Sequence, residues 1–320
     1  MIELRKRLKK INYLKDSVDG ILLFGNDPNF FYFTNSSNGI FFYDFLKPLI
    51  MISKIDERKR NYIKKMETEE KEFLNNLPSD GVIGINEKNL SVFMFRKIRR
   101  RLRTKNISKN LEEIRSIKTS YEIQCIRRAC LITKKIFSEI EDKIFKTTEN
   151  KLKNLIVSLI SEYGVESTFS PIVASSSNVV NPHHIPTKKR IKEPVLIDLG
   201  VRYNGYCSDV TRTLGSDLEN KIKNIMEELY PRVRPGIKAA SLEMFFRKKL
   251  GRDERFFVHS LGHGLGIEVH EKPFISKNSK DVLRENMVFT IEPAIYKKNG
   301  LRIENDFLLT KNSLKNLTDF

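Results

Sequence analysis

Three of the chain's five histidines lie in one short segment, from His259 to Glu271. They are His259, His263 and His270, and the other two, His183 and His184, precede an apolar run that ends in an aspartate. Histidine titrates near neutral pH and is the commonest metal ligand in proteins. The segment is therefore a candidate reaction centre.

Glycines alternate with other residues inside this segment, at Gly262, Gly264 and Gly266. Each glycine disfavours a helix interior by about 1 kcal/mol. We therefore predict a loop or irregular strand whose backbone comes close to another part of the molecule, although His259 and His263 have helical spacing. The alternative is a buried hairpin whose histidines are only hydrogen-bonded.

Four carboxylates lie at or near the ends of strand-like runs: Asp198, Asp209, Glu292 and Glu304. A carboxylate beside aliphatic residues is costly to bury unless it is paired or binds a metal. The turn Asn204–Gly205 favours a hairpin that brings Asp209 alongside Asp198. The alternative is that Asp198 is a turn residue and Asp209 a solvent-exposed strand end.

Together with His263, these acids form a set of four carboxylates and one imidazole. Such a set suits divalent Mn²⁺, Co²⁺ or Fe²⁺, with Zn²⁺ also possible. Without cations, four clustered carboxylates would repel one another and some would become protonated. Two dications would cancel the four negative charges, so the sequence favours a two-metal centre.

The elements that would position these residues follow two patterns. Residues 1–115 alternate strand-like and helix-like segments, which predicts a small α/β domain with a parallel or mixed sheet. Its expected strands are 19–25, 39–43, 48–52 and 81–85, and its expected helices are 54–75 and 91–103. In residues 116–320 we expect helices up to residue 140 and over 149–163, 219–233 and 240–250, with later strands at 286–293 and 300–309.

The whole-chain composition is that of a globular protein, and no apolar run approaches the roughly 20 residues that span a bilayer. The charged start, Met1–Lys10, has no apolar signal core after it, so we expect a cytoplasmic protein. Three cysteines without a metal-pair or disulfide spacing suit a reducing compartment. The net charge of +18 suggests nucleic-acid binding as one function to consider. We interpret the densest basic run, Arg96–Lys105, as the solvated face of a helix instead.

The order of these motifs resembles that of the proline-specific metallopeptidases of the pita-bread fold, namely proline dipeptidase (prolidase) and Xaa-Pro aminopeptidase. The matching segments are Ile197–Gly200, Ser208–Thr213, His259–Glu271, Ile291–Pro293 and Arg302–Glu304. Asp19–Gly20 and Asp27–Phe33 are similar to the opening domain of that family. The resemblance implies an N-terminal creatinase/prolidase-like domain, residues 1–115, and a pita-bread catalytic domain, residues 116–320.

The resemblance also implies a ligand set for two divalent ions. Asp198 would chelate one ion, Asp209 and Glu304 would bridge both, and His263 and Glu292 would complete the second. Mn²⁺ or Co²⁺ is the expected metal, with Fe²⁺ or Zn²⁺ as alternatives. A water or hydroxide between the ions would be the nucleophile.

Catalytic roles follow from the same resemblance. Glu292 would act as general base, and His270 would stabilise the oxyanion. His183 and His259 would line the substrate cleft. His184 stands where a small residue is expected, and of the adjacent pair we expect His183 to face the site.

Several positions depart from the family pattern. The segment between Thr213 and Arg234 is about three helical turns shorter than usual, which predicts a truncated helix. Phe274 stands where several dipeptidases carry an arginine that meets the substrate carboxylate, so strict dipeptide specificity is in doubt. Arg302 and Thr211 fit the family and would orient carboxylates.

We therefore expect a metal-dependent exopeptidase that cleaves Xaa-Pro dipeptides or peptides and forms a homodimer, without membrane or nucleic-acid partners. Two alternatives stay open. One is an aminopeptidase of other specificity, such as methionine aminopeptidase. The other is a non-catalytic basic pita-bread protein that binds nucleic acid or a protein partner, for which steeply salt-dependent binding would be the signature.

Overall fold

The computed structural model describes residues 2–51, 64–66, 73–74, 77–78 and 80–319. The chain divides into two compact units, Met1–Arg115 and Ser116–Phe320. Both units combine helices with β-sheets, which confirms the predicted α/β class.

The first unit is built on a six-stranded sheet with the order β4-β3-β2-β1-β5-β6. The strands are β1 (Gly20–Phe24), β2 (Ile40–Tyr43), β3 (Pro48–Met51), β4 (Lys64–Met66), β5 (Val82–Ile85) and β6 (Arg103–Asn106). The described helices are α1 (Ile2–Ile11), α2 (Pro28–Thr34), α4 (Val92–Arg99) and α5 (Ser108–Ser116). Strand β1 pairs antiparallel with β2 and parallel with β5, so the sheet is mixed, as predicted.

Two helix predictions in the first unit were wrong in part. The expected helix 54–75 contains strand β4, and most of its other residues lie outside the described residues. The expected helix 91–103 ends at Arg99, and Arg103 begins β6. Parallel pairing of β6 with β5 overrides the local helical pattern there. Ile98 is nevertheless buried, as the amphipathic pattern requires.

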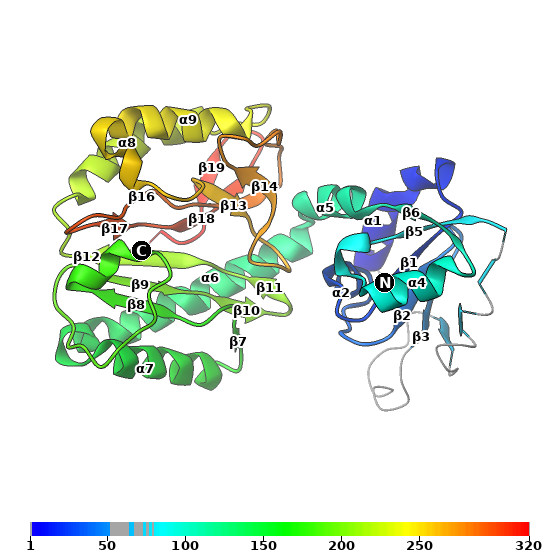
Figure 1. Ribbon diagram of the computed structural model, residues 1–320, viewed down its shortest axis with the longest axis horizontal. Coiled ribbons are helices and arrows are strands. Elements are labelled where there is room, and N and C mark those ends of the chain that lie inside the picture. Colours follow the sequence, from blue (N-terminus) through cyan, green and yellow to red (C-terminus); the bar gives the residue numbers. More distant parts are fainter. Residues whose placement is uncertain (1, 52–63, 67–72, 75–76, 79, 320) are drawn as a thin grey trace. The chain divides into compact units, whose positions relative to one another are not determined.

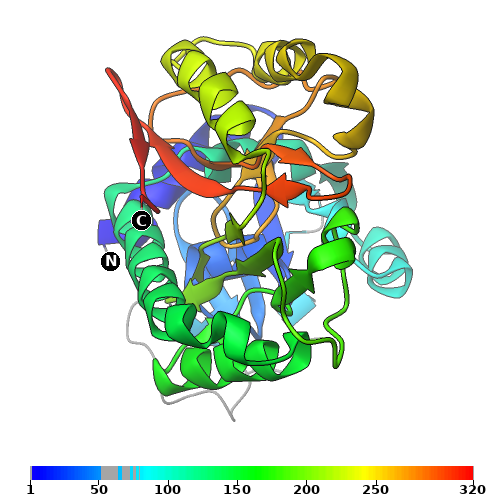
Figure 2. The same cartoon turned by 90° about the vertical axis from the view of Figure 1, so that its left-hand side faces the viewer.

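In the second unit, two pairs of helices enclose the strands, one pair on each outer side (Figures 1 and 2). The helices are α6 (Ser120–Ile140), α7 (Glu149–Glu162), α8 (Glu219–Leu229) and α9 (Ala239–Leu250). The apolar faces of α6 and α7 pack against one set of strands, and those of α8 and α9 against the other. None of the helices in the described part of the chain is both long and apolar enough to cross a membrane.

The strands of the second unit form four small sheets with the orders β12-β9-β8, β11-β10-β7, β14-β13-β15-β18-β19 and β16-β17. The strands of the earlier half are β7 (Glu166–Ser167), β8 (Ile172–Ser175), β9 (Val195–Leu199), β10 (Val201–Tyr203), β11 (Tyr206–Cys207) and β12 (Val210–Leu214). Those of the later half are β13 (Gly262–Gly264), β14 (Glu271–Ile275), β15 (Val288–Ile291), β16 (Ala294–Ile295), β17 (Leu301–Arg302), β18 (Asn305–Leu309) and β19 (Leu314–Asn316).

The hairpin predicted between Asp198 and Asp209 is present. Asn204 and Gly205 form its tip with φ of 48° and 85°, the left-handed values that an Asn-Gly turn supplies. Strand β12 then pairs antiparallel with β9, and Thr211 lies opposite Asp198. Asp209, two residues before Thr211, is therefore brought close to Asp198.

Strand β15 shows why Glu292 enters the same region. Met287, Phe289 and Ile291 are all buried in the core beneath α8 and α9, as their alternate spacing predicts. Strand β15 ends at Ile291, and Glu292 and Pro293 follow it directly. The alternation therefore turns the carboxylate away from the apolar core.

Candidate metal centre and active site

A cavity of about 490 Å³ opens within the second unit. Its lining contains four carboxylates and four histidines: Asp198, Asp209, Glu292, Glu304, His183, His184, His263 and His270. They come from strands and loops that are widely separated in the sequence. The structure thus brings all five expected metal ligands to one cavity, and His259 lies beside it, with Nδ1 3.6 Å from Glu292 Oε2.

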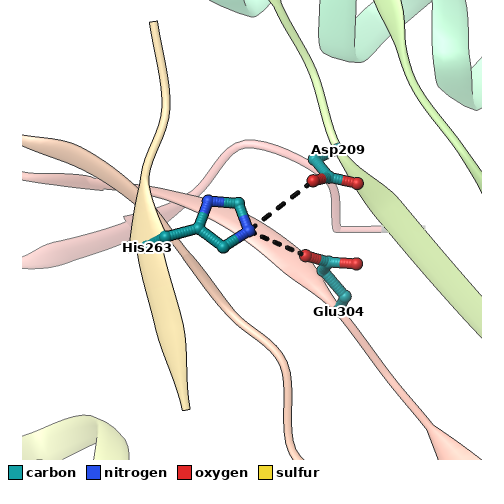
Figure 3. Close-up of side chains that lie close together, drawn as sticks. All are labelled: Asp209, His263 and Glu304. Carbon is teal, nitrogen blue, oxygen red and sulfur yellow. Dashed lines mark ion pairs between the residues drawn. The ribbon is translucent and has the colours of Figure 1, made fainter. Parts of the chain in front are cut away.

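Asp209, His263 and Glu304 form the centre of this group (Figure 3). His263 Nε2 lies 3.7 Å from Asp209 Oδ2 and 3.9 Å from Glu304 Oε1. His263 Nδ1 donates to the carbonyl oxygen of Gly264 at 3.2 Å, because a carbonyl can only accept. The lone pair of Nε2 therefore faces the two carboxylates.

Glu292 and Asp198 extend the cluster. Glu292 Oε1 lies 3.6 Å from His263 Nε2. Asp198 Oδ2 accepts a hydrogen bond from Arg302 Nη2 at 2.6 Å, but Asp198 Oδ1 is buried and has no hydrogen-bond partner among the described residues. A buried carboxylate oxygen without a donor is costly, and a positively charged partner at this atom would offset that cost.

Burial and mutual repulsion govern the acidity of these groups. Burial, reinforced by the neighbouring Glu304, raises the pKa of Asp209 well above its usual range. Burial, reinforced by Glu292, does the same to the pKa of Glu304. Burial raises the pKa of Glu292 to about 8 and lowers the pKa of His263 to about 3. His263 is thus the neutral imidazole that a metal ion requires.

The donor set and its spacing fit divalent metal ions. Two ligand atoms at about 2.1 Å from one ion lie up to about 4.2 Å apart. The separations of 3.6 to 3.9 Å around His263 Nε2 fall within that limit and are too long for hydrogen bonds. Cations placed among these atoms would remove the repulsion that raises the carboxylate pKa values.

A second layer of hydrogen bonds orients the carboxylates. Thr211 Oγ1 donates to Glu304 Oε2 at 2.8 Å, and Arg302 Nε donates to Thr211 Oγ1 at 3.0 Å. Arg302 is buried, and burial alone would lower its pKa, but the Asp198 carboxylate more than compensates and raises it. Arg302 therefore remains charged and fixes both Asp198 and, through Thr211, Glu304.

Tyr296 links this layer to His259, and sequence reasoning missed it. Arg302 Nη1 donates to Tyr296 Oη at 2.9 Å, and Tyr296 Oη lies 2.8 Å from His259 Nε2. His259 Nδ1 donates to the Ser260 carbonyl at 2.7 Å, which leaves Nε2 to accept from the tyrosine. Burial lowers the pKa of His259 to about 4, so this ring is neutral. No local sequence pattern marks Tyr296.

The adjacent histidines His183 and His184 have different surroundings. Both line the cavity, but His184 Nε2 lies 2.9 Å from Oε2 of the buried Glu149, at the start of α7. His183 is exposed. His184 is thus tied to the protein, and this arrangement favours His183 as the residue that meets a substrate. Sequence reasoning also missed Glu149.

The imidazole of His270 lies against the imidazole of His263, with the two ring centroids 4.1 Å apart. The next residue, Glu271, forms a buried ion pair with Lys118, with Oε1 and Nζ 2.6 Å apart. This pair holds the backbone beside His270. It was not expected from the sequence, because Lys118 lies far from the segment that it anchors.

The glycines of the His259–Glu271 segment allow the close approach that was predicted. A Cβ atom at Gly262 would lie 2.1 Å from the Thr290 carbonyl oxygen. One at Gly264 would lie 2.1 Å from the Lys272 carbonyl oxygen. The segment forms the irregular strand β13, with a register shift between His263 and Gly264. The backbone contact therefore sets the position of His263.

The geometry can be compared with known proteins. Residues 124–311 match metallopeptidase family M24. The Xaa-Pro dipeptidase of Pyrococcus horikoshii is 33% identical, over 98% of this chain and 97% of its own.

The fold is similar to those of solved proline-specific peptidases. The crystal structure of the prolidase from Pyrococcus horikoshii has a TM-score of 0.87 at 30% identity, over 98% of each chain. That of the X-Pro aminopeptidase from Thermotoga maritima has a TM-score of 0.86 at 26% identity, over 95% of this chain and 96% of its own. The likeness spans both units of the chain.

Proposed function

Because the chain belongs to metallopeptidase family M24, we propose that it is a metal-dependent exopeptidase that hydrolyses the bond between an N-terminal residue and a following proline. Its similarity to an Xaa-Pro dipeptidase and an X-Pro aminopeptidase supports this specificity. The observation that carries the proposal is the convergence of four carboxylates and His263 on one cavity. The similarity to these pita-bread peptidases, with all five proposed ligands lining one cavity, does not favour a non-catalytic binding protein.

Asp198, Asp209, His263, Glu292 and Glu304 would hold two divalent ions, Mn²⁺ or Co²⁺ in the first place and Fe²⁺ or Zn²⁺ as alternatives. The partnerless oxygen of Asp198 and the neutral Nε2 of His263 support this ligand set. When bound, such ions act as Lewis acids that polarise a carbonyl group and lower the pKa of water.

The remaining roles belong to side chains of this chain. Glu292 lines the cavity and would accept the proton of the attacking water. His270 would donate a hydrogen bond to the oxygen that becomes negative as the carbonyl is attacked. His183 would contact the substrate directly. His259, held by Tyr296 and Ser260, would form the wall behind Glu292.

The proposal is tested with purified protein that has been stripped of metal and reloaded with Mn²⁺ or Co²⁺. We expect release of the N-terminal amino acid from Leu-Pro but not from Leu-Ala, and bound metal near two equivalents per chain. The variant His263→Ala is the matched control and should lose both metal and activity. Reloaded protein that binds metal but cleaves neither peptide would contradict the proposal.

We propose that the units Met1–Arg115 and Ser116–Phe320 are the N-terminal and catalytic domains of a homodimer. The cysteines at positions 125, 130 and 207 are buried and form no disulfide within the described residues, which supports a reducing cytoplasmic location. Light scattering of the purified protein tests the dimer.

A further inference from the structure

We propose that Lys153 binds the free carboxylate of a dipeptide substrate, so that the cavity selects dipeptides over longer peptides. This inference rests on the proposed peptidase function and adds the substrate class. Among the described residues that line the cavity, the cationic side chains other than histidine are Lys153 and Arg302.

These two cations have different surroundings. Arg302 is buried and bound to Asp198, Thr211 and Tyr296, so it is committed to the protein. Lys153 is half-buried, and within the described part of the chain it has neither an ion pair nor a hydrogen bond from its side chain. A lysine at a cavity wall without an anionic partner is available to an anionic ligand.

The wall that carries Lys153 is firmly built. Glu149 lies one helical turn earlier on the same face of α7. It accepts hydrogen bonds from the backbone N–H groups of Ser175 and Thr187 at 2.9 and 3.0 Å, and from Asn178 Nδ2 at 2.8 Å. These bonds fix the start of α7 to the loop that bears His183, and therefore fix the position from which Lys153 extends.

The cavity that Lys153 and the carboxylates share also has an apolar part of its lining that suits a proline ring. Phe169, Pro171 and Ile172 lie in the cavity wall, and Ile172 pairs with Asp198 across β8 and β9. The carboxylate of a dipeptide lies only one residue, roughly 3.5 Å of chain, beyond the scissile bond. A proline seated on this apolar wall would therefore direct its carboxylate away from the acidic cluster.

The position at which an arginine was expected does not supply the charge. Phe274 is 41% exposed and does not line the cavity. Phe274 at this position therefore puts strict dipeptide specificity in doubt. Lys153 provides a cation from a different element, α7, and could not be inferred from the motifs.

The test removes the charge from the protein and from the substrate in turn. Lys153→Met keeps the length of the side chain, and Leu-Pro amide keeps the substrate but lacks its carboxylate. We expect Lys153→Met to lower kcat/KM for Leu-Pro about tenfold, mostly through KM, as for a lost charge-assisted hydrogen bond. The amide should be cleaved equally by both proteins, and Lys153→Arg should restore cleavage of Leu-Pro to within about threefold.

Lys151→Met is the matched control, because Lys151 lies on α7 but is exposed and does not line the cavity. Its kinetics should equal those of the wild type. Equal losses of Lys153→Met on Leu-Pro and on its amide, or no loss on either, would overturn the inference while the peptidase function stands. A wild-type enzyme that cleaves neither substrate would overturn both.

Discussion

Glu149 and the carboxylates of the cavity are both buried in the second unit, but they have different partners. Glu149 accepts hydrogen bonds from backbone and side-chain donors. Burial alone would raise the pKa of Glu149, and the bonds from His184, Thr187 and Asn178 outweigh it and lower the pKa.

The cavity carboxylates have fewer donors and more anionic neighbours. The pKa values of Asp209 and Glu304 are raised by burial and by other acids, and Asp198 Oδ1 has no hydrogen-bond partner in the part of the chain that the structure describes. Donors within the protein thus stabilise the charge of Glu149. The cavity carboxylates have fewer such donors, and a bound cation could compensate their charges. The comparison distinguishes a buried acid that the fold itself satisfies from the acids that we propose as metal ligands.

The largest expected effect is the loss of activity in Glu304→Gln. The substitution keeps the shape of the side chain but removes one of the converging charges. We expect kcat to fall at least about 1,000-fold, which corresponds to about 4 kcal/mol of barrier. In metal-free protein the same variant should unfold at a higher temperature than the wild type, because a repulsive charge has gone. Kinetics with Mn²⁺ and thermal unfolding in EDTA measure the two effects, and a lower unfolding temperature in EDTA would contradict the comparison.

Glu149→Gln should destabilise the protein, whereas Glu304→Gln should stabilise its metal-free form. The amide cannot accept from all the donors that surround it, so several buried N–H groups lose a partner. We expect a loss of about 3 kcal/mol in the free energy of unfolding, equal with and without metal. Urea denaturation in EDTA and in MnCl₂ tests this. A loss seen only in MnCl₂ would place Glu149 with the metal site instead.

The third prediction concerns the pH dependence of metal-free protein. Burial raises the folded pKa of Glu292 to about 8, so its contribution to stability is present at low pH and is lost as the pH rises to about 8. The lowered pKa values of His259 and His263, about 4 and 3, act in the opposite sense, but that gain is complete near pH 7 because the unfolded value is 6.5.

From pH 7 to 8 the free energy of unfolding in EDTA should therefore fall, by about 1 kcal/mol from Glu292 alone. Saturating Mn²⁺ should abolish this fall, because the ions favour the charged carboxylates. Urea titrations at the two pH values, each with and without the metal, measure the difference. Metal-free protein that becomes more stable over this interval would break the comparison.

Asp306 is an intermediate case and should show the smallest effect. Its Oδ2 accepts hydrogen bonds from the Asp209 backbone N–H and from Cys130 Sγ, whereas Oδ1 has no hydrogen-bond partner within the described ranges of the chain. Burial raises the pKa of Asp306 to about 7, so the carboxyl is largely protonated at pH 6. Asp306→Asn imitates that neutral form, and at pH 6 we expect a change below about 1 kcal/mol in the free energy of unfolding. A loss as large as that of Glu149→Gln would show that Asp306 needs its charge.

The sequence predicted the cavity residues that end strands. The two-residue alternation through Met287 and Ile291 oriented Glu292, and the Asn204–Gly205 turn brought Asp209 towards Asp198. Both signals are local, since strand periodicity and turn geometry are set by neighbouring residues. The family resemblance, which the comparisons confirm, supplied the rest of the ligand set as an expectation.

Other features could not be predicted because their causes are not local. Arg103 lies in a basic helical pattern, yet it begins β6, because the edge of β5 is available for pairing. Glu149 and Tyr296 acquire their roles from residues distant in the sequence. Lys153 is one of many lysines in the sequence, and only its place in the cavity wall distinguishes it.

The separation of the proposed ligands along the chain has a consequence for biosynthesis. The Glu304 backbone N–H donates to the Thr211 carbonyl oxygen at 3.0 Å, so this carboxylate takes its place only when its segment has paired with β12. A nascent polypeptide on the ribosome would therefore have incomplete metal affinity until the segment around Glu304 has emerged and folded back. Metal loading would follow the last steps of folding of the second unit, and the choice of ion would depend on which cations are available at that moment.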